Sequence, residues 1–83
     1  MTTKQVESFD KCCAAWTDAY CDDHNCKPQD IPLWWAVETA EMHLDNIECG
    51  TWGDEEDWCE EEKEEYEATK AFIRKYKRYV NRK

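Results

Sequence analysis

Residues 54–80, DEEDWCEEEKEEYEATKAFIRKYKRYV, decide the fold more than any other part of the chain. This stretch contains neither glycine nor proline. In its second half, apolar or small side chains recur at steps of three and four residues, as they do on one face of an α-helix: Thr69, Phe72, Ile73, Tyr76, Tyr79 and Val80. Asp54 suits the position before a first helical turn, because its carboxylate can accept a free backbone N–H. The pattern predicts one long helix over residues 55–81, roughly 40 Å long at 1.5 Å per residue.

A first helix is predicted over residues 3–20. Its apolar side chains share one face, and Thr2-Thr3-Lys4-Gln5 loosely matches a capping box in which Thr2 or Thr3 caps the helix. The dense turn formers of residues 21–30 predict a loop.

A second helix is predicted over residues 32–49. Pro32 suits its first turn, with Asp30 or Ile31 as the capping residue, and Gly50 suits a left-handed C-terminal cap. Trp35 and Met42 lie opposite the main apolar stripe of this helix. Either the helix is buried on both sides, or Trp35 and Met42 form an exposed strip for a partner or for a second copy of the chain.

The whole chain, residues 1–83, is expected to form one all-α domain. Eighty-three residues suffice for a single thin core, and two glycines and two prolines suit long helices joined by short loops. Short loops favour antiparallel neighbours. We therefore predict a compact three-helix bundle, up-down-up, with a longer C-terminal helix.

Charge is divided sharply along the chain. The net charge is −9. Residues 1–67 carry 20 acids and four lysines (4 − 20 = −16), whereas residues 68–83 carry seven bases and no acid (+7). The field of the main body therefore repels phosphate, which argues against direct binding of nucleic acid or of an anionic membrane. The basic end is expected to overhang the 21–30 loop and to bring two sets of side chains together: Asp22, Asp23 and Asp30 with Lys75, Arg78 and Arg82.

The acidic run at residues 54–67 is the main candidate for function. Acids in a first helical turn complement the helix dipole, but like charges four residues apart destabilise a helix. The run either keeps the protein soluble or presents carboxylates to a basic partner, imitating DNA phosphates spaced about 1.7 Å apart along the axis. A third, weaker reading is binding of divalent ions. The candidate partner-binding residues are Glu55, Glu56, Asp57, Glu60, Glu61, Glu62, Glu64 and Glu65, together with Trp35 and Met42.

The six cysteines leave three readings open: core thiols, disulfides or metal ligands. Cys21, His24 and Cys26 form the best candidate zinc site, to be completed by another cysteine. Their spacing is not a standard zinc knuckle, so no cofactor is expected, with zinc as the alternative. A Cys21–Cys26 disulfide or two free thiols are the simpler readings.

The expected function is non-enzymatic. Ser8 is the only serine, neither histidine lies in a triad context, and two isolated glycines cannot form a phosphate loop. We expect an acidic inhibitor or adaptor that binds a basic surface of a nucleic-acid-binding protein. In size and charge alone, the chain is similar to bacteriophage-encoded antagonists of host defence or transcription, including anti-CRISPR proteins. The alternatives are a small zinc-binding helical module and a homo-oligomeric structural protein.

A cytoplasmic location is expected, in the host cytoplasm if the protein is viral. The first residues contain no apolar run typical of a secretory signal. No stretch approaches the ~20 apolar residues of a membrane span.

Overall fold

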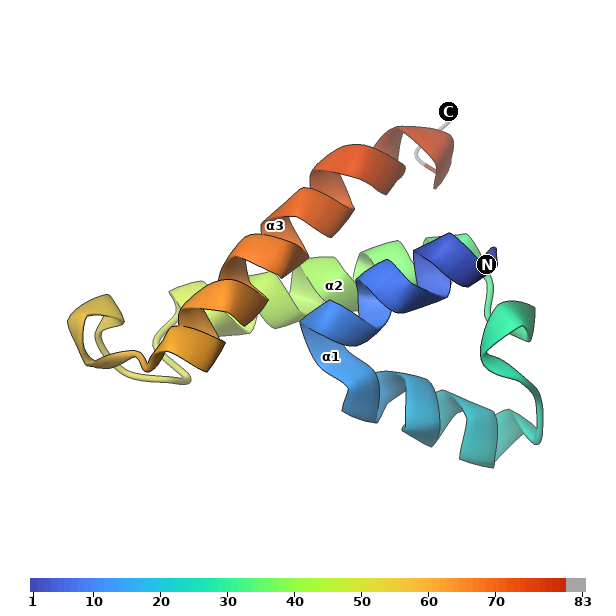
Figure 1. The fold of residues 1–83 in the computed structure, drawn as a ribbon, viewed down its shortest axis with the longest axis horizontal. Helices are drawn as coiled ribbons and strands as arrows, with labels where there is room; N and C mark the ends of the chain where they lie inside the picture. Colours follow the sequence, from blue (N-terminus) through green and yellow to red (C-terminus); the bar gives the residue numbers. More distant parts are fainter. Residues whose placement is uncertain (81–83) are drawn as a thin grey trace.

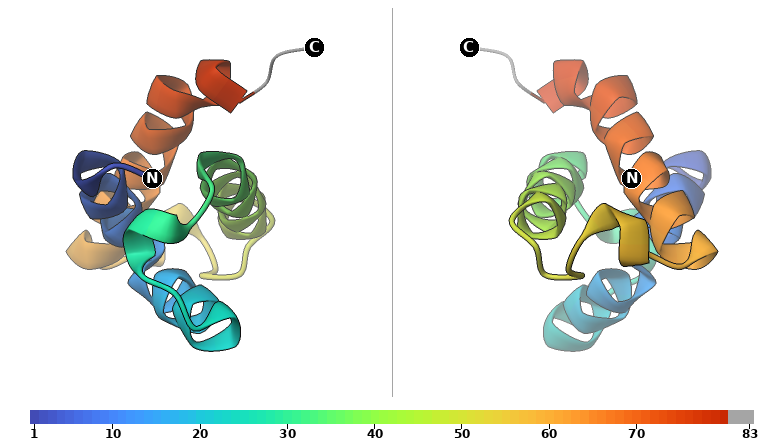
Figure 2. Two further views of the ribbon diagram at one scale, coloured as in Figure 1. Left: turned by 90° about the vertical axis from the view of Figure 1, so that its right-hand side faces the viewer. Right: turned by 90° about the vertical axis from the view of Figure 1, so that its left-hand side faces the viewer.

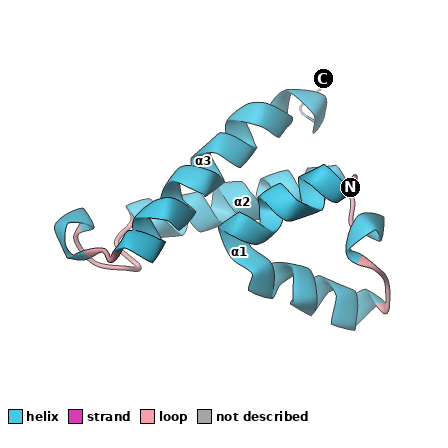
Figure 3. Ribbon diagram, viewed as in Figure 1, coloured by secondary structure: helices cyan, strands magenta, loops and turns pink. Residues whose placement is uncertain are grey.

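The computed structural model describes residues 1–80, apart from the side chain of Cys13. These residues contain helices and no strand, as Figures 1 and 3 show, which confirms the all-α prediction. The elements are α1 (Thr3–His24), the single 3-10 turn η1 (Pro28–Asp30), α2 (Leu33–Glu48), the 3-10 turn η2 (Glu55–Asp57) and α3 (Glu60–Val80). None of the helices within residues 1–80 combines the length and the apolar character needed to cross a bilayer.

The start of α1 has the predicted capping box. The Thr2 hydroxyl accepts the backbone N–H of Gln5 at 3.2 Å, and the Gln5 side chain accepts the N–H of Thr2 at 2.8 Å. Two N–H groups that lack helical partners are thereby satisfied.

Replacing Thr2 by alanine is expected to lower the free energy of unfolding by about 1 kcal/mol, because it leaves one of these N–H groups without a partner. Urea unfolding followed by circular dichroism measures the change. Thr3→Ala is the matched control, since Thr3 is exposed and lies inside the helix. Equal losses in the two variants would contradict a capping role for Thr2.

Helix α1 ends four residues later than predicted, at His24 rather than at residue 20. Asn25 ends it in the left-handed conformation (φ 50°, ψ 50°), which asparagine tolerates better than most residues. The polar residues that suggested a loop therefore form the exposed last turn of the helix.

Helix α1 also bends sharply near its middle, so that its two arms diverge (Figure 1). The Thr17 hydroxyl donates to the Asp10 carboxylate at 3.0 Å. In a straight helix, residues seven apart are separated by about 10 Å along the axis. Two short side chains cannot bridge that distance, so this hydrogen bond requires the bend. The Cys12 thiol donates to the carbonyl oxygen of Ser8 at 3.3 Å in the same region.

The bend changes the topology from the one predicted. In Figure 1 the first arm of α1 and the whole of α2 run in the same direction, whereas the second arm of α1 and α3 run back. The up-down-up prediction is therefore wrong, because it treated α1 as one straight rod. The three predicted α-helices are present in residues 1–80, but α1 contributes two arms of different direction in place of one straight rod (Figure 1).

Both ends of α2 differ slightly from expectation. Pro32 precedes the helix as its capping residue, whereas Ile31, one of the two predicted caps, is fully buried. At the other end Gly50 adopts the predicted left-handed conformation (φ 101°). The N–H groups of Gly50 and Thr51 donate to the carbonyls of Ile47 and Asn46, each at 3.1 Å, as in a Schellman motif.

Helix α3 begins at Glu60, five residues later than the predicted start at residue 55. Residues 55–57 form η2, and Trp58 follows in an extended conformation (φ −67°, ψ 138°). This break removes two repulsive pairs that an uninterrupted helix would contain, Glu56/Glu60 and Asp57/Glu61. It also turns the Trp58 side chain into the protein, where it is only 8% exposed.

The core lies where α3 crosses the first arm of α1 and α2. Its buried members are Phe9, Cys12, Ala36, Val37, Ala40, Phe72 and Tyr76. Phe9 and Phe72 are at the centre, with ring centroids 5.5 Å apart. The terminal ammonium of Met1 closes one edge by donating to the carbonyls of Gln29 and Ile31 at 2.8 and 2.7 Å.

The basic end of α3 does not reach the acids of the 21–30 loop. The end of α3 and the end of α1 lie on opposite sides of the molecule in Figures 1 and 2. Lys77 instead pairs with Glu41 of α2 at 2.8 Å. The predicted contact of Asp22, Asp23 and Asp30 with Lys75 and Arg78 is therefore wrong, since it assumed an unbent α1; Arg82 lies outside the described residues.

Candidate partner-binding surface

The acidic segment, defined here as residues 54–64, lies at one end of the molecule. In Figure 1 the η2 turn forms the left tip, next to the first turn of α3. Figure 2 shows in its right-hand view that this tip faces outward, between α2 and α3.

A cluster of aromatic rings holds the acidic segment in place from behind. Trp58 meets Trp52 and Tyr66 edge-on, with ring centroids 5.7 and 5.0 Å away, and its indole N–H donates to the Gly53 carbonyl at 3.4 Å. The Tyr66 hydroxyl donates to Glu48 at 3.1 Å. Loss of solvent around Tyr66, followed by this bond to a carboxylate, raises the pKa of the phenol. The backbone of the acidic segment is thus held in place by packed aromatic side chains.

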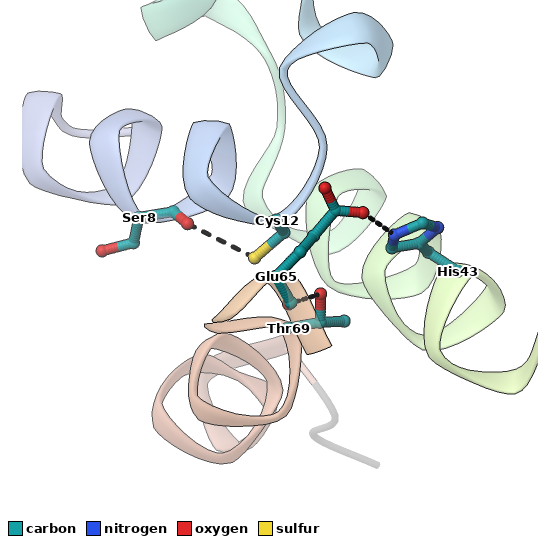
Figure 4. Close-up of polar contacts among 5 residues, drawn as sticks. All are labelled: Ser8, Cys12, His43, Glu65 and Thr69. Atoms are coloured by element: carbon teal, nitrogen blue, oxygen red, sulfur yellow. Dashed lines mark hydrogen bonds and ion pairs between the residues drawn. The ribbon is translucent and has the colours of Figure 1, made fainter. Parts of the chain in front are cut away.

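Two of the predicted partner-binding acids have structural roles. Glu62 accepts the backbone N–H of Cys59 at 3.0 Å and so completes the first turn of α3. Glu65 lies 2.8 Å from Nε2 of His43 on α2, and the Thr69 hydroxyl donates to the Glu65 carbonyl oxygen at 2.7 Å (Figure 4). The contacts of Glu62 and Thr69 lie at the start of α3 and within it, and the contact of Glu65 joins α3 to α2.

The pairing of His43 with Glu65 was not expected from the sequence. The His43 side chain is half-buried and joins α2 to α3. No local pattern identifies this pair, because its members are 22 residues apart and meet only when α2 and α3 pack.

Cys12 of α1 lies near Glu65 and Thr69, but its thiol is not expected to be reactive. Figure 4 shows the Cys12 thiol donating a hydrogen bond to the carbonyl oxygen of Ser8 within α1. Burial raises the pKa of Cys12 to about 11, although a hydrogen bond with Thr69 acts in the opposite direction. A reactive thiol needs a lowered pKa, so the junction does not resemble the site of a cysteine nucleophile.

The other six predicted acids point into solvent. They are Glu55, Glu56 and Asp57 on η2, and Glu60, Glu61 and Glu64 on α3. Within residues 1–80, none of them forms an ion pair. We call these six residues the free acidic patch.

The start of α3 at Glu60 changes the electrostatic explanation of this patch. Glu60, Glu61 and Glu62 now occupy the first turn, where negative charge complements the helix dipole. Glu64 lies beyond the first turn and repels Glu60 at the spacing of four residues. The η2 acids have no long helix to complement. Fold stability therefore accounts for part of the patch and leaves Glu55, Glu56, Asp57 and Glu64 unexplained.

The predicted strip of Trp35 and Met42 is divided by the structure. Trp35 is partly buried against the core, with its ring centroid 6.0 Å from that of Phe9 and 4.6 Å from that of Tyr20. Met42 is 48% exposed. Trp35 therefore belongs to the packing between α1 and α2, and we leave it out of the candidate surface.

The three predicted zinc ligands are not gathered around one point. His24 stacks on Tyr20 with a ring-centroid distance of 4.0 Å, and its Nδ1 lies 3.1 Å from the Tyr20 carbonyl oxygen. Among the described residues, no group of three or more His, Cys, Asp or Glu side chains is arranged to hold a metal ion. Zinc binding by Cys21, His24 and Cys26 stays a prediction. The thiols of Cys12, Cys21, Cys26, Cys49 and Cys59 are free.

Comparisons with known proteins give no further guide. The chain matches no protein-family model, no curated protein and no solved structure. The free acidic patch therefore has to be interpreted from its own chemistry.

Proposed function

We propose that this protein is a non-enzymatic inhibitor or adaptor whose free acidic patch binds a basic, nucleic-acid-binding surface of a target protein. The observation that carries the proposal is the exposure of six carboxylates without an ion pair among the described residues. A phage-encoded antagonist of host defence, such as an anti-CRISPR protein, is one class of protein that such a patch would serve.

The packing behind the patch supports this proposal. Trp58 is only 8% exposed and fixes the chain between η2 and α3, so the backbone that carries the carboxylates is packed against the rest of the protein. With the backbone fixed, the conformational entropy lost on binding is mainly that of the carboxylate side chains. Exposed carboxylates also attract a basic surface from a distance and speed its association.

Affinity capture from the native host tests the partner class. The immobilised protein is incubated with host extract, and bound proteins are released either by sodium chloride or by double-stranded DNA. We expect nucleic-acid-binding proteins to be released by DNA, and also by salt between about 0.1 and 1 M. Over that range of salt the Debye screening length falls from about 10 to 3 Å, which weakens the attraction between exposed charges. Binding that resists both salt and DNA would disprove charge mimicry.

A triple variant, Glu60→Gln with Glu61→Gln and Glu64→Gln, tests the location of the surface. We expect its affinity for the captured partner to fall at least about tenfold, which corresponds to 1.4 kcal/mol. Titration of the purified partner by calorimetry measures the change, and circular dichroism verifies the fold.

The matched control removes three exposed acids from α1: Glu7→Gln with Asp18→Asn and Asp23→Asn. It changes the net charge equally, so we expect its affinity to stay within about twofold of the unaltered protein. Equal losses in the two triple variants would show that net charge acts without any defined patch.

A further inference from the structure

The end of α1 brings two cysteines together. The backbone N–H of Cys26 donates to the carbonyl oxygen of Cys21 at 3.2 Å, across the left-handed turn at Asn25. In this type of helix ending, the side chains of these two positions commonly contact each other. With this 3.2 Å hydrogen bond, the lengths that join the two Cα atoms sum to about 7.4 Å, and the angles between them bring the Cα atoms closer than that. Disulfides join Cα atoms in this range.

The charge and burial around the two thiols agree with the closeness of Cys21 and Cys26. Both side chains are half-buried. Loss of solvent raises the pKa of Cys21, and the neighbouring Cys26 thiol and then the Asp18 and Asp22 carboxylates raise it further. The Cys26 thiol is therefore near enough to affect the ionisation of Cys21.

We propose that Cys21 and Cys26 form a reversible disulfide by exchange with a small disulfide such as oxidised glutathione. The Cys26 thiolate attacks one sulfur of glutathione disulfide and releases one glutathione thiolate. The Cys21 thiolate then attacks the Cys26 sulfur of the mixed disulfide and releases the second glutathione. The protein loses two protons and two electrons, and one glutathione disulfide becomes two glutathione molecules.

The surroundings of Cys21 assign it to the closing step. Loss of solvent and the neighbouring Asp18 and Asp22 carboxylates raise the pKa of Cys21 and disfavour its thiolate, so closure is expected to be slow at neutral pH. The rate of closure is expected to increase between pH 7 and pH 9. Because the two residues are already neighbours, the oxidised protein is expected to keep its helices. The disulfide then links the last turn of α1 to the loop that leads to η1.

Digestion with a protease that cleaves before aspartate identifies the bond. Cleavage before Asp18, Asp22 and Asp23 separates Cys21 from Cys26, and both from Cys12 and Cys13. The reduced protein is equilibrated with oxidised glutathione, remaining thiols are alkylated, and the fragments are weighed. We expect a 21–26 linked pair of fragments, an unchanged helical spectrum and a melting temperature a few degrees higher.

Variants decide whether the two cysteines act as a pair. Cys21→Ser should stop the reaction at a glutathione adduct on Cys26, and Cys26→Ser should abolish the linked fragments. The control, Cys49→Ser with Cys59→Ser, removes two exposed thiols at the other end of the molecule and should leave the 21–26 bond unaffected. The proposal is overturned if the control loses the bond, if the unaltered protein accumulates only mixed disulfides, or if oxidation reduces its helical content. None of these outcomes depends on the acidic patch.

Discussion

Phe9→Ala is expected to lower the free energy of unfolding by about 3–5 kcal/mol. The Phe9 side chain is fully buried and meets both Phe72 and Trp35, so its removal leaves a cavity between all three helices. A domain of 83 residues has a total stability of about 4–12 kcal/mol at 0.05–0.15 kcal/mol per residue. The loss therefore amounts to between about a quarter and the whole of that stability, so the variant is expected to unfold at a clearly lower temperature and urea concentration than the unaltered protein.

Thermal and urea unfolding, followed by circular dichroism and tryptophan fluorescence, measure this loss. Tyr79→Ala is the control, because Tyr79 is an aromatic residue that is 51% exposed. Its effect should stay below about 1 kcal/mol. If both variants unfolded at the same urea concentration, Phe9 would not be at the centre of the core.

The second large effect concerns alkaline pH. Burial raises the pKa of Cys12 to about 11, compared with 9.0 for an exposed thiol. Below pH 9 the thiol is protonated in both the folded and the unfolded protein, so its contribution to stability is fully present. Between pH 9 and pH 11 only the unfolded protein loses the proton, and folding becomes less favourable. Two pKa units correspond to a loss of up to about 3 kcal/mol.

Urea unfolding at a series of pH values from 8 to about 11 tests this prediction. Lysines and tyrosines also titrate in this range, so the informative quantity is the difference in pH dependence between the unaltered protein and Cys12→Ala. The variant is less stable at pH 8 because it lacks the buried sulfur, but its stability should fall less steeply above pH 9. Parallel curves would show that Cys12 is not desolvated in the folded protein.

Local features of the fold were predictable from the sequence because they depend on neighbouring residues. The Thr2–Gln5 capping box and the left-handed Gly50 rest on interactions within one or two turns. The spacing of Thr69, Phe72 and Tyr76 identifies the buried face of α3, although Tyr79, which was predicted on the same face, is 51% exposed. The bend in α1 and the break at Trp58 were not predictable in this way. They depend on where Phe9, Thr17 and Trp58 become buried once the helices pack.

The candidate site was predictable only in part for the same reason. The sequence indicates a dense acidic run, and six of its predicted partner-binding acids are exposed. It does not indicate that Glu62 caps α3 or that Glu65 meets His43, since the first depends on the helix start and the second on packing against α2.

The break at Trp58 has a consequence for the shape of any partner. An unbroken helix would set its carboxylates along one straight line, like the phosphates of one strand of a straight duplex. Because the chain turns between η2 and α3, Glu55, Glu56 and Asp57 lie on a separate turn from Glu60, Glu61 and Glu64, and the six carboxylates do not follow one straight helix axis. Under the proposed function, the basic surface of the target has to meet both groups of carboxylates. The proposed function therefore predicts that DNA with a fixed kink displaces the protein from its target better than straight DNA of the same length.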